Sequence, residues 1–184
     1  MDTERLYTII VFSENAPGLI SQISSIFTRR QVNIESINAC PSSIQGIHRH
    51  TITCVCSESM VKMLTLQIEK RIEVLQARYY EDDSLFILEA AMFKISTPVM
   101  LERREVSERA REFGANFVEV NSIYSVLQFT GHSEQVQELF DKLSELGAVR
   151  QFVRTGRICI AKTMEEHLNN YLALREQERL EKQL

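Results

Sequence analysis

The chain has 184 residues, of which 44% are hydrophobic and 25% are charged, so it can bury a core as one domain or as two small ones. Its formal net charge of −4 argues against a surface for nucleic acid or for an anionic membrane, because such surfaces need an excess of Lys and Arg. No apolar run has the length of a membrane span and no signal peptide is recognisable, so we expect a cytoplasmic protein with four reduced cysteines.

Residues 1–80 predict strands and helices in the order β-α-β-β-α-β. The strands are rich in Ile, Val and Phe, and the helices repeat apolar residues at the 3.6-residue spacing. The expected strands are 7–13, 32–37, 47–56 and 73–80, and the expected helices are 19–30 and 58–71. This order is the split βαβ, or ferredoxin-like, motif, in which a four-stranded antiparallel sheet carries two helices on one face.

After an acidic segment at 81–84, which we expect to be a linker, the same order repeats over 85–163. The expected strands are 85–95, 116–121, 124–130 and 149–153 with a possible extension at 157–161, and the expected helices are 98–113 and 133–146. The charged segment 164–184 favours a helix, either solvated or docked on a partner. The sequence therefore predicts an α+β chain of two ferredoxin-like βαββαβ domains followed by a helical tail.

The stretch Glu14 to Ile20 joins the first predicted strand to the first predicted helix. The first N–H groups of a helix have no intrahelical acceptor, and with the positive end of the helix dipole they suit a small anion such as a carboxylate. Pro17 fixes φ, Gly18 admits close approach to the backbone, and Asn15 is expected to cap the helix. The same residues also suit a plain strand–turn–helix joint, so both interpretations stay open on the residues alone.

Other kinds of site have weaker support. His48, His50, Cys54 and Cys56 share one face of a predicted strand, but a strand spreads them over about 26 Å. A metal site would need further ligands, so we expect packed thiols and no metal. We find no catalytic motif, no phosphate loop and no nucleotide-binding glycine pattern, and the third strand lacks the aromatic residues of RNA-binding sheets.

A series of short motifs runs along the first 160 residues. They are Glu14–Leu19, Phe27–Arg30, Asn33–Ser36, Arg49–Ile52, Phe93–Ile95, Ser122–Val126 and Arg154–Gly156. Together they resemble the regulatory small subunit of acetolactate synthase, also called acetohydroxyacid synthase. The resemblance implies an N-terminal ACT domain, a C-terminal domain of related fold, a homodimer through the ACT domains, and a chain that is not itself an enzyme.

The resemblance also implies a partner and an effector. Family members activate a large catalytic subunit and make it sensitive to feedback inhibition by valine, which binds between two ACT domains. Thiamine diphosphate, Mg²⁺ and FAD belong to the large subunit, and none of them to this chain. Carried over by position, the effector site consists of Asn15, Pro17, Gly18, Leu19 and Ile20 from one protomer with Asn33 and Ile34 from the other. The valine carboxylate would meet the backbone N–H groups of residues 18–20, and its ammonium would meet side-chain or backbone oxygens of Asn15 and Asn33.

Two residues depart from the usual family pattern. Pro17 replaces a small residue, usually Ser, and Gln31 replaces a frequent glycine, so the Gln31 turn must form without one. The second half lacks the loop, because Pro98 and Leu101 stand at the positions of Asn15 and Gly18. Two alternatives are a free-standing double-ACT amino-acid sensor with another partner, and a small metal or acyl-phosphate enzyme on the same fold.

Overall fold

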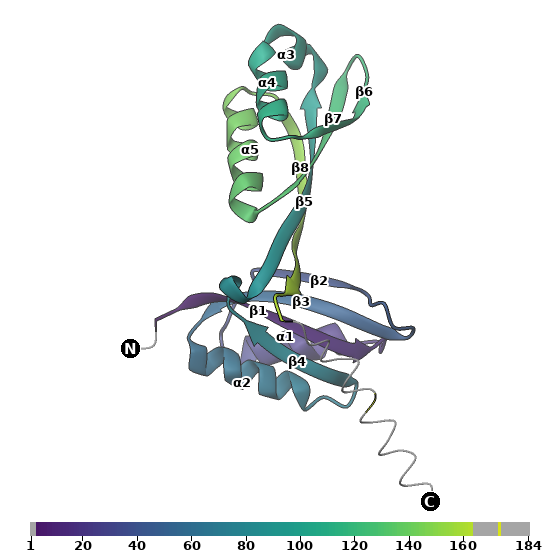
Figure 1. The fold of residues 1–184 in the computed structure, drawn as a ribbon, viewed down its shortest axis with the longest axis vertical. Helices are drawn as coiled ribbons and strands as arrows, with labels where there is room; N and C mark the ends of the chain where they lie inside the picture. Colours follow the sequence, from purple (N-terminus) through teal and green to yellow (C-terminus); the bar gives the residue numbers. More distant parts are fainter. Residues whose placement is uncertain (1–2, 164–172, 174–184) are drawn as a thin grey trace, which may run out of the picture. The chain divides into compact units, whose positions relative to one another are not determined.

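The structure is a computed structural model that describes residues 3–163 and residue 173. The predicted tail at 164–184 therefore lies outside the described residues except for Ala173. The chain forms two compact units (Figure 1), one with the described residues up to Phe86 and from Ile160 onward, the other with residues 87–159. Among the described residues, no helix has the length and apolar composition that a membrane crossing requires.

The first unit is a four-stranded sheet in the order β2-β3-β1-β4, with helices α1 and α2 on one face (Figure 1). Its elements are β1 (Arg5–Glu14), α1 (Leu19–Arg29), β2 (Ser36–Pro41), β3 (Ile47–Cys56), α2 (Glu58–Glu69) and β4 (Val74–Tyr80). The pairings of β1 with β3 and β4, and of β2 with β3, are antiparallel. The predicted order of elements is confirmed.

Alternate residues of β1 and β3 make the core of the first unit. Tyr7, Ile9 and Val11 on β1 lie among buried residues of both helices, such as Ile23 on α1 and Leu64 on α2. This period of two follows from the pleat, which points successive side chains to opposite faces of the sheet. The packed face fixes the end of β1 and the start of α1, and so positions the loop between them.

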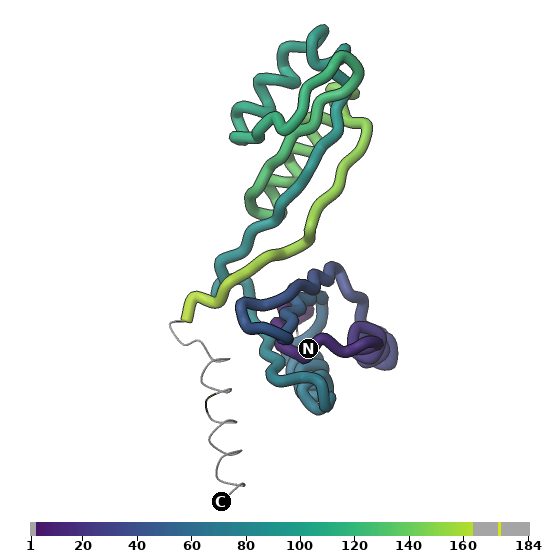
Figure 2. Tube along the Cα trace, turned by 90° about the vertical axis from the view of Figure 1, so that its right-hand side faces the viewer, coloured from purple at the N-terminus to yellow at the C-terminus, as the bar shows by residue number. Residues whose placement is uncertain are grey.

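The second unit is a sheet in the order β6-β7-β5-β8, in which β5 and β8 run side by side (Figure 2). Its elements are β5 (Leu85–Ser96), α3 (Thr97–Glu102), α4 (Arg104–Glu112), β6 (Asn116–Val120), β7 (Tyr124–Gly131), α5 (Ser133–Glu145) and β8 (Val149–Ala161). The 3₁₀ turn η1 (Asp82–Ser84) occupies the predicted linker. The two strand segments predicted near the end form one continuous strand, β8, which the prediction had divided.

The predicted start of the second strand is wrong, because β2 begins at Ser36 and not at Val32. Val32 and Ile34 pack against the hydrophobic core from a loop. Regular pairing is reached only at Glu35, whose N–H donates to the Thr53 carbonyl at 2.8 Å. A loop with one buried side has the same apolar alternation as a half-buried strand, which explains the error.

The predicted helix 98–113 is also wrong, because it breaks into α3 and α4 at Arg103, which has φ −116° and ψ 97°. In one continuous helix Arg103 would share a face with Val99, Val106 and Ala110, which pack in the core. The break leaves Arg103 exposed, and its guanidinium donates to the Leu146 carbonyl at 3.1 Å. Avoiding a buried charge therefore outweighs the helical propensity of the segment.

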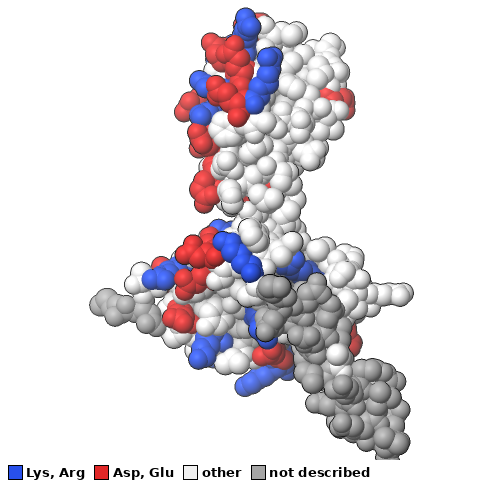
Figure 3. Space-filling model, viewed as in Figure 1, with Lys and Arg blue, Asp and Glu red and all other residues white. Residues whose placement is uncertain are grey.

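Charged and apolar side chains occupy different parts of the second unit. In the view of Figure 3, charged residues gather over α4 and α5, whereas the β6–β7 hairpin shows few. Every residue of β6 is exposed, including Phe117, Val118 and Val120, and Ile123 in the following turn is 74% exposed. β6 is thus an apolar strand at an edge of its sheet.

Helix α1 ends in a Schellman motif built without glycine. Gln31 has φ +55°, the N–H of Gln31 donates to Thr28 O at 3.1 Å, and the N–H of Val32 donates to Phe27 O at 3.1 Å. A side chain in the left-handed region costs about 1–2 kcal/mol. The expectation that this turn forms without glycine is confirmed, at a cost in stability.

We expect Gln31→Gly to raise the free energy of unfolding by about 0.5–1 kcal/mol. Glycine removes the left-handed strain but loses part of that gain because it makes the unfolded chain more mobile. Chemical denaturation measures the change, and Gln31→Ala, which keeps a Cβ at the same φ, should give no gain. Equal stability of the Gly and Ala variants would contradict the assignment of strain to this residue.

Candidate functional site at the start of helix α1

The loop between β1 and α1 consists of residues 15–18. Its last residue, Gly18, is the N-cap of α1 with φ +84° and ψ −6°, and no side chain caps the helix. The prediction that Asn15 caps α1 is therefore wrong, and its backbone N–H donates instead to Gly46 O at 3.3 Å. Within residues 3–163, the donors at the start of α1 thus have no side-chain acceptor.

The amide groups of this helix end can receive an anion. The Leu19 N–H makes one long bond, 3.4 Å, to the Ala16 carbonyl, while Ile20 and Ser21 belong to the first turn, whose N–H groups lack intrahelical acceptors. A Cβ placed on Gly18 would meet none of the described atoms within 4 Å, so the space beside it is open. Open donors at the positive end of a helix suit a carboxylate.

Of the side chains around these donors, one is buried in the core and the others are exposed. Leu19 is 2% exposed and lies in the core, so it can offer a ligand only its backbone. Asn15, Pro17 and Gly18 are exposed, and Ile20 is 48% exposed. The loop therefore presents a polar amide, backbone donors and one apolar side chain to an approaching molecule.

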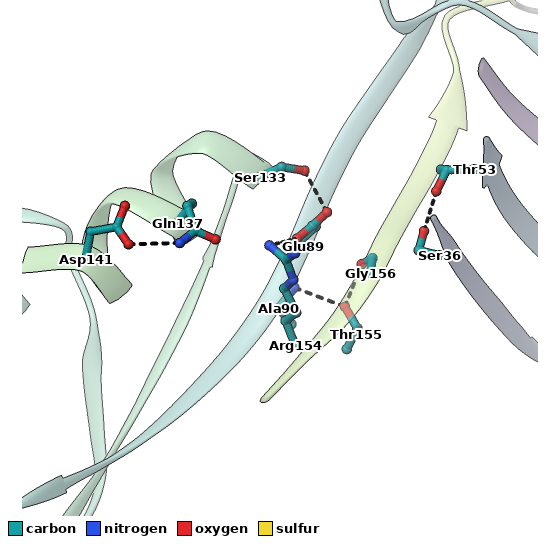
Figure 4. Close-up of polar contacts among 10 residues, drawn as sticks. All are labelled: Ser36, Thr53, Glu89, Ala90, Ser133, Gln137, Asp141, Arg154, Thr155 and Gly156. Atoms are coloured by element: carbon teal, nitrogen blue, oxygen red, sulfur yellow. Dashed lines mark hydrogen bonds and ion pairs between the residues drawn. The ribbon is translucent and has the colours of Figure 1, made fainter. Parts of the chain in front are cut away.

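The other two predicted residues lie in the loop that leads into β2. Asn33 is exposed, and Ile34 is half-buried against the core. The start of β2 is held by a hydrogen bond of 2.7 Å between Ser36 Oγ and Thr53 Oγ1 (Figure 4). This bond fixes the strand end next to Ile34 and so limits where Asn33 can lie.

Within one chain these two groups of residues lie at opposite ends of the sheet. The register places Ser36 beside Thr53, which pairs with Thr8. Glu14, next to the β1–α1 loop, lies along the same strand at about 3.3 Å per residue, so the two ends are about 20 Å apart. The structure brings residues 15–20 together and leaves Asn33 and Ile34 away from them.

The sequence did not identify a polar pair beneath the β1–α1 loop. Ser13 Oγ and His50 Nε2 are 2.9 Å apart, and the two residues are 0% and 3% exposed. Burial lowers the pKa of His50, and the nearby His48 lowers it further. The sequence could have indicated this pair, because His50 lies at one of the alternate positions of β3 whose side chains face the core.

The four side chains considered as metal ligands have other surroundings. His50 contacts Ser13, and the Sγ atoms of Cys54 and Cys56 lie 3.8 Å apart in the core. Burial, with the neighbouring Cys56, raises the pKa of Cys54 to about 12, so this thiol stays protonated at neutral pH. Across the described part of the chain, no three His, Cys, Asp or Glu side chains are placed to hold a metal ion.

In the second unit, Arg154-Thr155-Gly156 joins neighbouring elements (Figure 4). Thr155 Oγ1 accepts from the Ala90 N–H at 3.2 Å and donates to Gly156 O at 2.8 Å. Arg154 Nη1 lies 3.9 Å from a carboxylate oxygen of the buried Glu89, whose other oxygen accepts from Ser133 Oγ at 2.6 Å. These contacts tie β5 to β8 and α5.

Comparison with known proteins assigns both units. Residues 88–163 match the family described as the small subunit of acetolactate synthase, and residues 7–73 match the ACT domain. The chain is 31% identical to the acetolactate synthase small subunit of Bacillus subtilis over 165 residues, which cover 89% of this chain and 93% of that protein. It is 28% identical to a probable acetolactate synthase small subunit of Methanothermobacter thermautotrophicus, over 85% and 92% of the two chains.

The solved acetolactate synthase small subunit of Thermotoga maritima has the same fold. The TM-score is 0.79 at 20% identity, with 88% of this chain and 99% of that chain covered. The predicted pair of ferredoxin-like domains is thereby confirmed. Taken with the sequence matches along both units, these likenesses show that the chain belongs to the acetolactate synthase small-subunit family.

Proposed function

We propose that this chain is the regulatory subunit that activates the large subunit of acetolactate synthase and makes it sensitive to feedback inhibition by valine. Membership of the small-subunit family implies a large catalytic partner. The observation that carries the effector role is the uncapped, open start of α1. We further propose that the complex is cytoplasmic and that thiamine diphosphate, Mg²⁺ and FAD bind to the large subunit alone.

In this proposal the start of α1 recognises the acid group of valine. The carboxylate accepts hydrogen bonds from the N–H groups of residues 18–20, and the ammonium donates to oxygens of Asn15 and Asn33. The side chains of Ile20 and Ile34 border the isopropyl group. Hydrogen bonds to charged groups contribute about 1.5–3 kcal/mol each, so the contacts at the two ends of the amino acid supply most of the selectivity for a zwitterion.

A second copy of the chain can bring the separated residues together. β2 is an edge strand: among the described residues no further strand pairs with its outer side, and Ile37 on it is 39% exposed. If β2 pairs antiparallel with β2 of a second copy, the start of one strand lies opposite the end of the other. That end, Pro41, is in register with His48 and Ser13, next to the β1–α1 loop. Asn33 of one copy then approaches Asn15 of the other.

Feedback inhibition requires valine to bind two states of the complex with different affinity. A ligand shifts an equilibrium only by that difference, typically about 1–3 kcal/mol for allosteric proteins. This coupling is reciprocal. If valine changes the affinity of this chain for the large subunit by some factor, the large subunit changes the affinity of this chain for valine by the same factor.

Calorimetric titration of valine into this chain, alone and with the large subunit, tests the proposal. We expect one valine per site between two copies, and affinities that differ between the two titrations by about five- to 150-fold. Identical affinities would contradict the allosteric role. Valine binding without formation of a complex with the large subunit would favour the free-standing sensor, and co-purification identifies its partner.

A further inference from the structure

We propose that His50 is a positioning residue for the β1–α1 loop, and that its protonation weakens amino-acid binding there. This inference rests on the proposed effector function of the loop. Ser13 and His50 touch neither the open donors of α1 nor, in the proposal, the amino acid. They act through the backbone that leads into the loop.

A chain of hydrogen bonds connects the ring to the loop. His50 Nε2 lies 2.9 Å from Ser13 Oγ, and Ser13 Oγ donates to the Glu14 carbonyl at 3.0 Å. The same carbonyl accepts from the Ala16 N–H at 3.0 Å. The peptide groups on both sides of Asn15 are therefore oriented by the buried pair.

The hydrogen bonds of Ser13 favour one tautomer of neutral His50. A serine hydroxyl has one hydrogen, and here it is used for the Glu14 carbonyl. With that hydrogen used, Ser13 Oγ accepts from the ring, and we assign the hydrogen of neutral His50 to Nε2. Nδ1 is buried and receives no hydrogen bond from the described residues. It is an acceptor without a donor.

The surroundings offer little to stabilise a charged ring. By register and sequence, the nearest titratable or charged groups are the exposed Glu14 on β1, Cys40 on β2, and His48 and Arg49 on β3. Arg71 and Glu73 lie in the turn before β4, whose Val74 pairs with Ser13. Helix α1 has no charged residue before Arg29. The guanidinium of Arg49 lies 6.0 Å from the ring centroid of Phe12. His48 opposes a second proton on His50, whereas Arg49, paired with Phe12, points to the other face of the sheet.

Protonation therefore changes the loop. A proton on Nδ1 creates a buried N–H that needs an acceptor, either water or a carbonyl, and reaching one requires Ser13 and the adjoining loop to move. The pKa of His50 is lowered from 6.5 by burial first and by His48 second. His50 is therefore neutral, and supports the loop, at neutral pH. This support is lost as the pH falls below 6.5, the ordinary pKa of histidine, toward the lowered pKa of His50.

The test is the pH dependence of valine affinity in the full chain between about pH 5 and pH 8. Wild type should keep constant affinity in the upper part of this range and lose up to about tenfold per pH unit in the lower part. His50→Gln keeps a donor for Ser13 but cannot titrate, so it should bind as wild type at pH 8 and show no acid loss from this position. His50→Leu removes the donor, so it should bind more weakly than His50→Gln at every pH, also without the acid loss.

His48→Gln is the matched control on the same strand: it should keep an acid loss, moved to higher pH than in wild type because His48 no longer lowers the pKa of His50. Amide hydrogen exchange of residues 15–19, compared between His50→Gln and wild type at each pH without valine, reports on the loop independently of binding. Protection in wild type should fall at acid pH relative to the variant. An acid loss of affinity and protection that persists in His50→Gln would overturn the inference. If valine fails to bind at any pH while the exchange difference appears, the effector proposal fails and the loop-positioning role stands.

Discussion

Gly18→Asp is expected to abolish the valine response of the complex while activation of the large subunit is retained. The variant places a carboxylate beside the donors that are proposed to hold the carboxylate of valine. Two unit charges about 4 Å apart repel by about 4 kcal/mol at the effective dielectric of a protein surface. Valine affinity should therefore fall by about 30- to 1,000-fold, measured by calorimetry and by inhibition of the complex.

The control must separate charge from backbone strain, because Gly18 has φ +84°. Gly18→Asn is well matched, since Asn and Asp both tolerate the left-handed region and have nearly the same shape. The Asn variant carries no charge, so we expect a much smaller loss of affinity. Equal losses in the two variants would assign the effect to the backbone, and retained valine inhibition in Gly18→Asp would count against the site.

Asn15→Ala and Asn33→Ala are expected to weaken valine binding by similar amounts although the two residues lie at opposite ends of the sheet in one chain. Each removes one hydrogen bond to the charged ammonium, which corresponds to about 1.5–3 kcal/mol, or about 10- to 150-fold in affinity. Both side chains are exposed, so neither change should alter the stability of the fold by more than about 0.5 kcal/mol.

Asn116→Ala provides the control for these variants. Asn116 stands at the start of β6, in the repeat where β5 leads at Ser96 directly into α3 without a loop of the Asn15–Gly18 kind. It should bind valine as wild type does. A loss of affinity in this variant would mean that the second unit takes part in the effector site.

The order of elements could be predicted because each half alternates clear strand and helix periods. β3 was predicted with the bounds observed, since Gly46 in the turn before it and Ser57, the N-cap of α2, after it mark both of its ends. The predicted ends of other elements were wrong where a tertiary contact outweighs the local sequence pattern. Val32 and Ile34 mimic a strand but fill the core from a loop, and Arg103 ends a helix by binding Leu146.

The backbone conformation of the candidate site could be predicted from the sequence, but the contacts of its side chains could not. Gly18 and the start of α1 follow from a strand, a Pro-Gly turn and an amphipathic helix. The cap was misassigned because Asn15 is three residues before Gly18, and its backbone is bound to Gly46, far along the chain. The Ser13–His50 pair needs the register of β1 against β3, which no local pattern specifies.

A mixed dimer tests most directly whether one amino acid is held by α1 of one copy and the β2 loop of another. Asn15→Ala and Asn33→Ala chains with different tags are combined, and the heterodimer is isolated and titrated with valine. One of its two sites then has both Asn residues and the other has neither. We predict that each homodimer binds weakly, whereas the heterodimer regains one site of wild-type affinity. A heterodimer that binds as weakly as both homodimers would contradict a site shared between two copies.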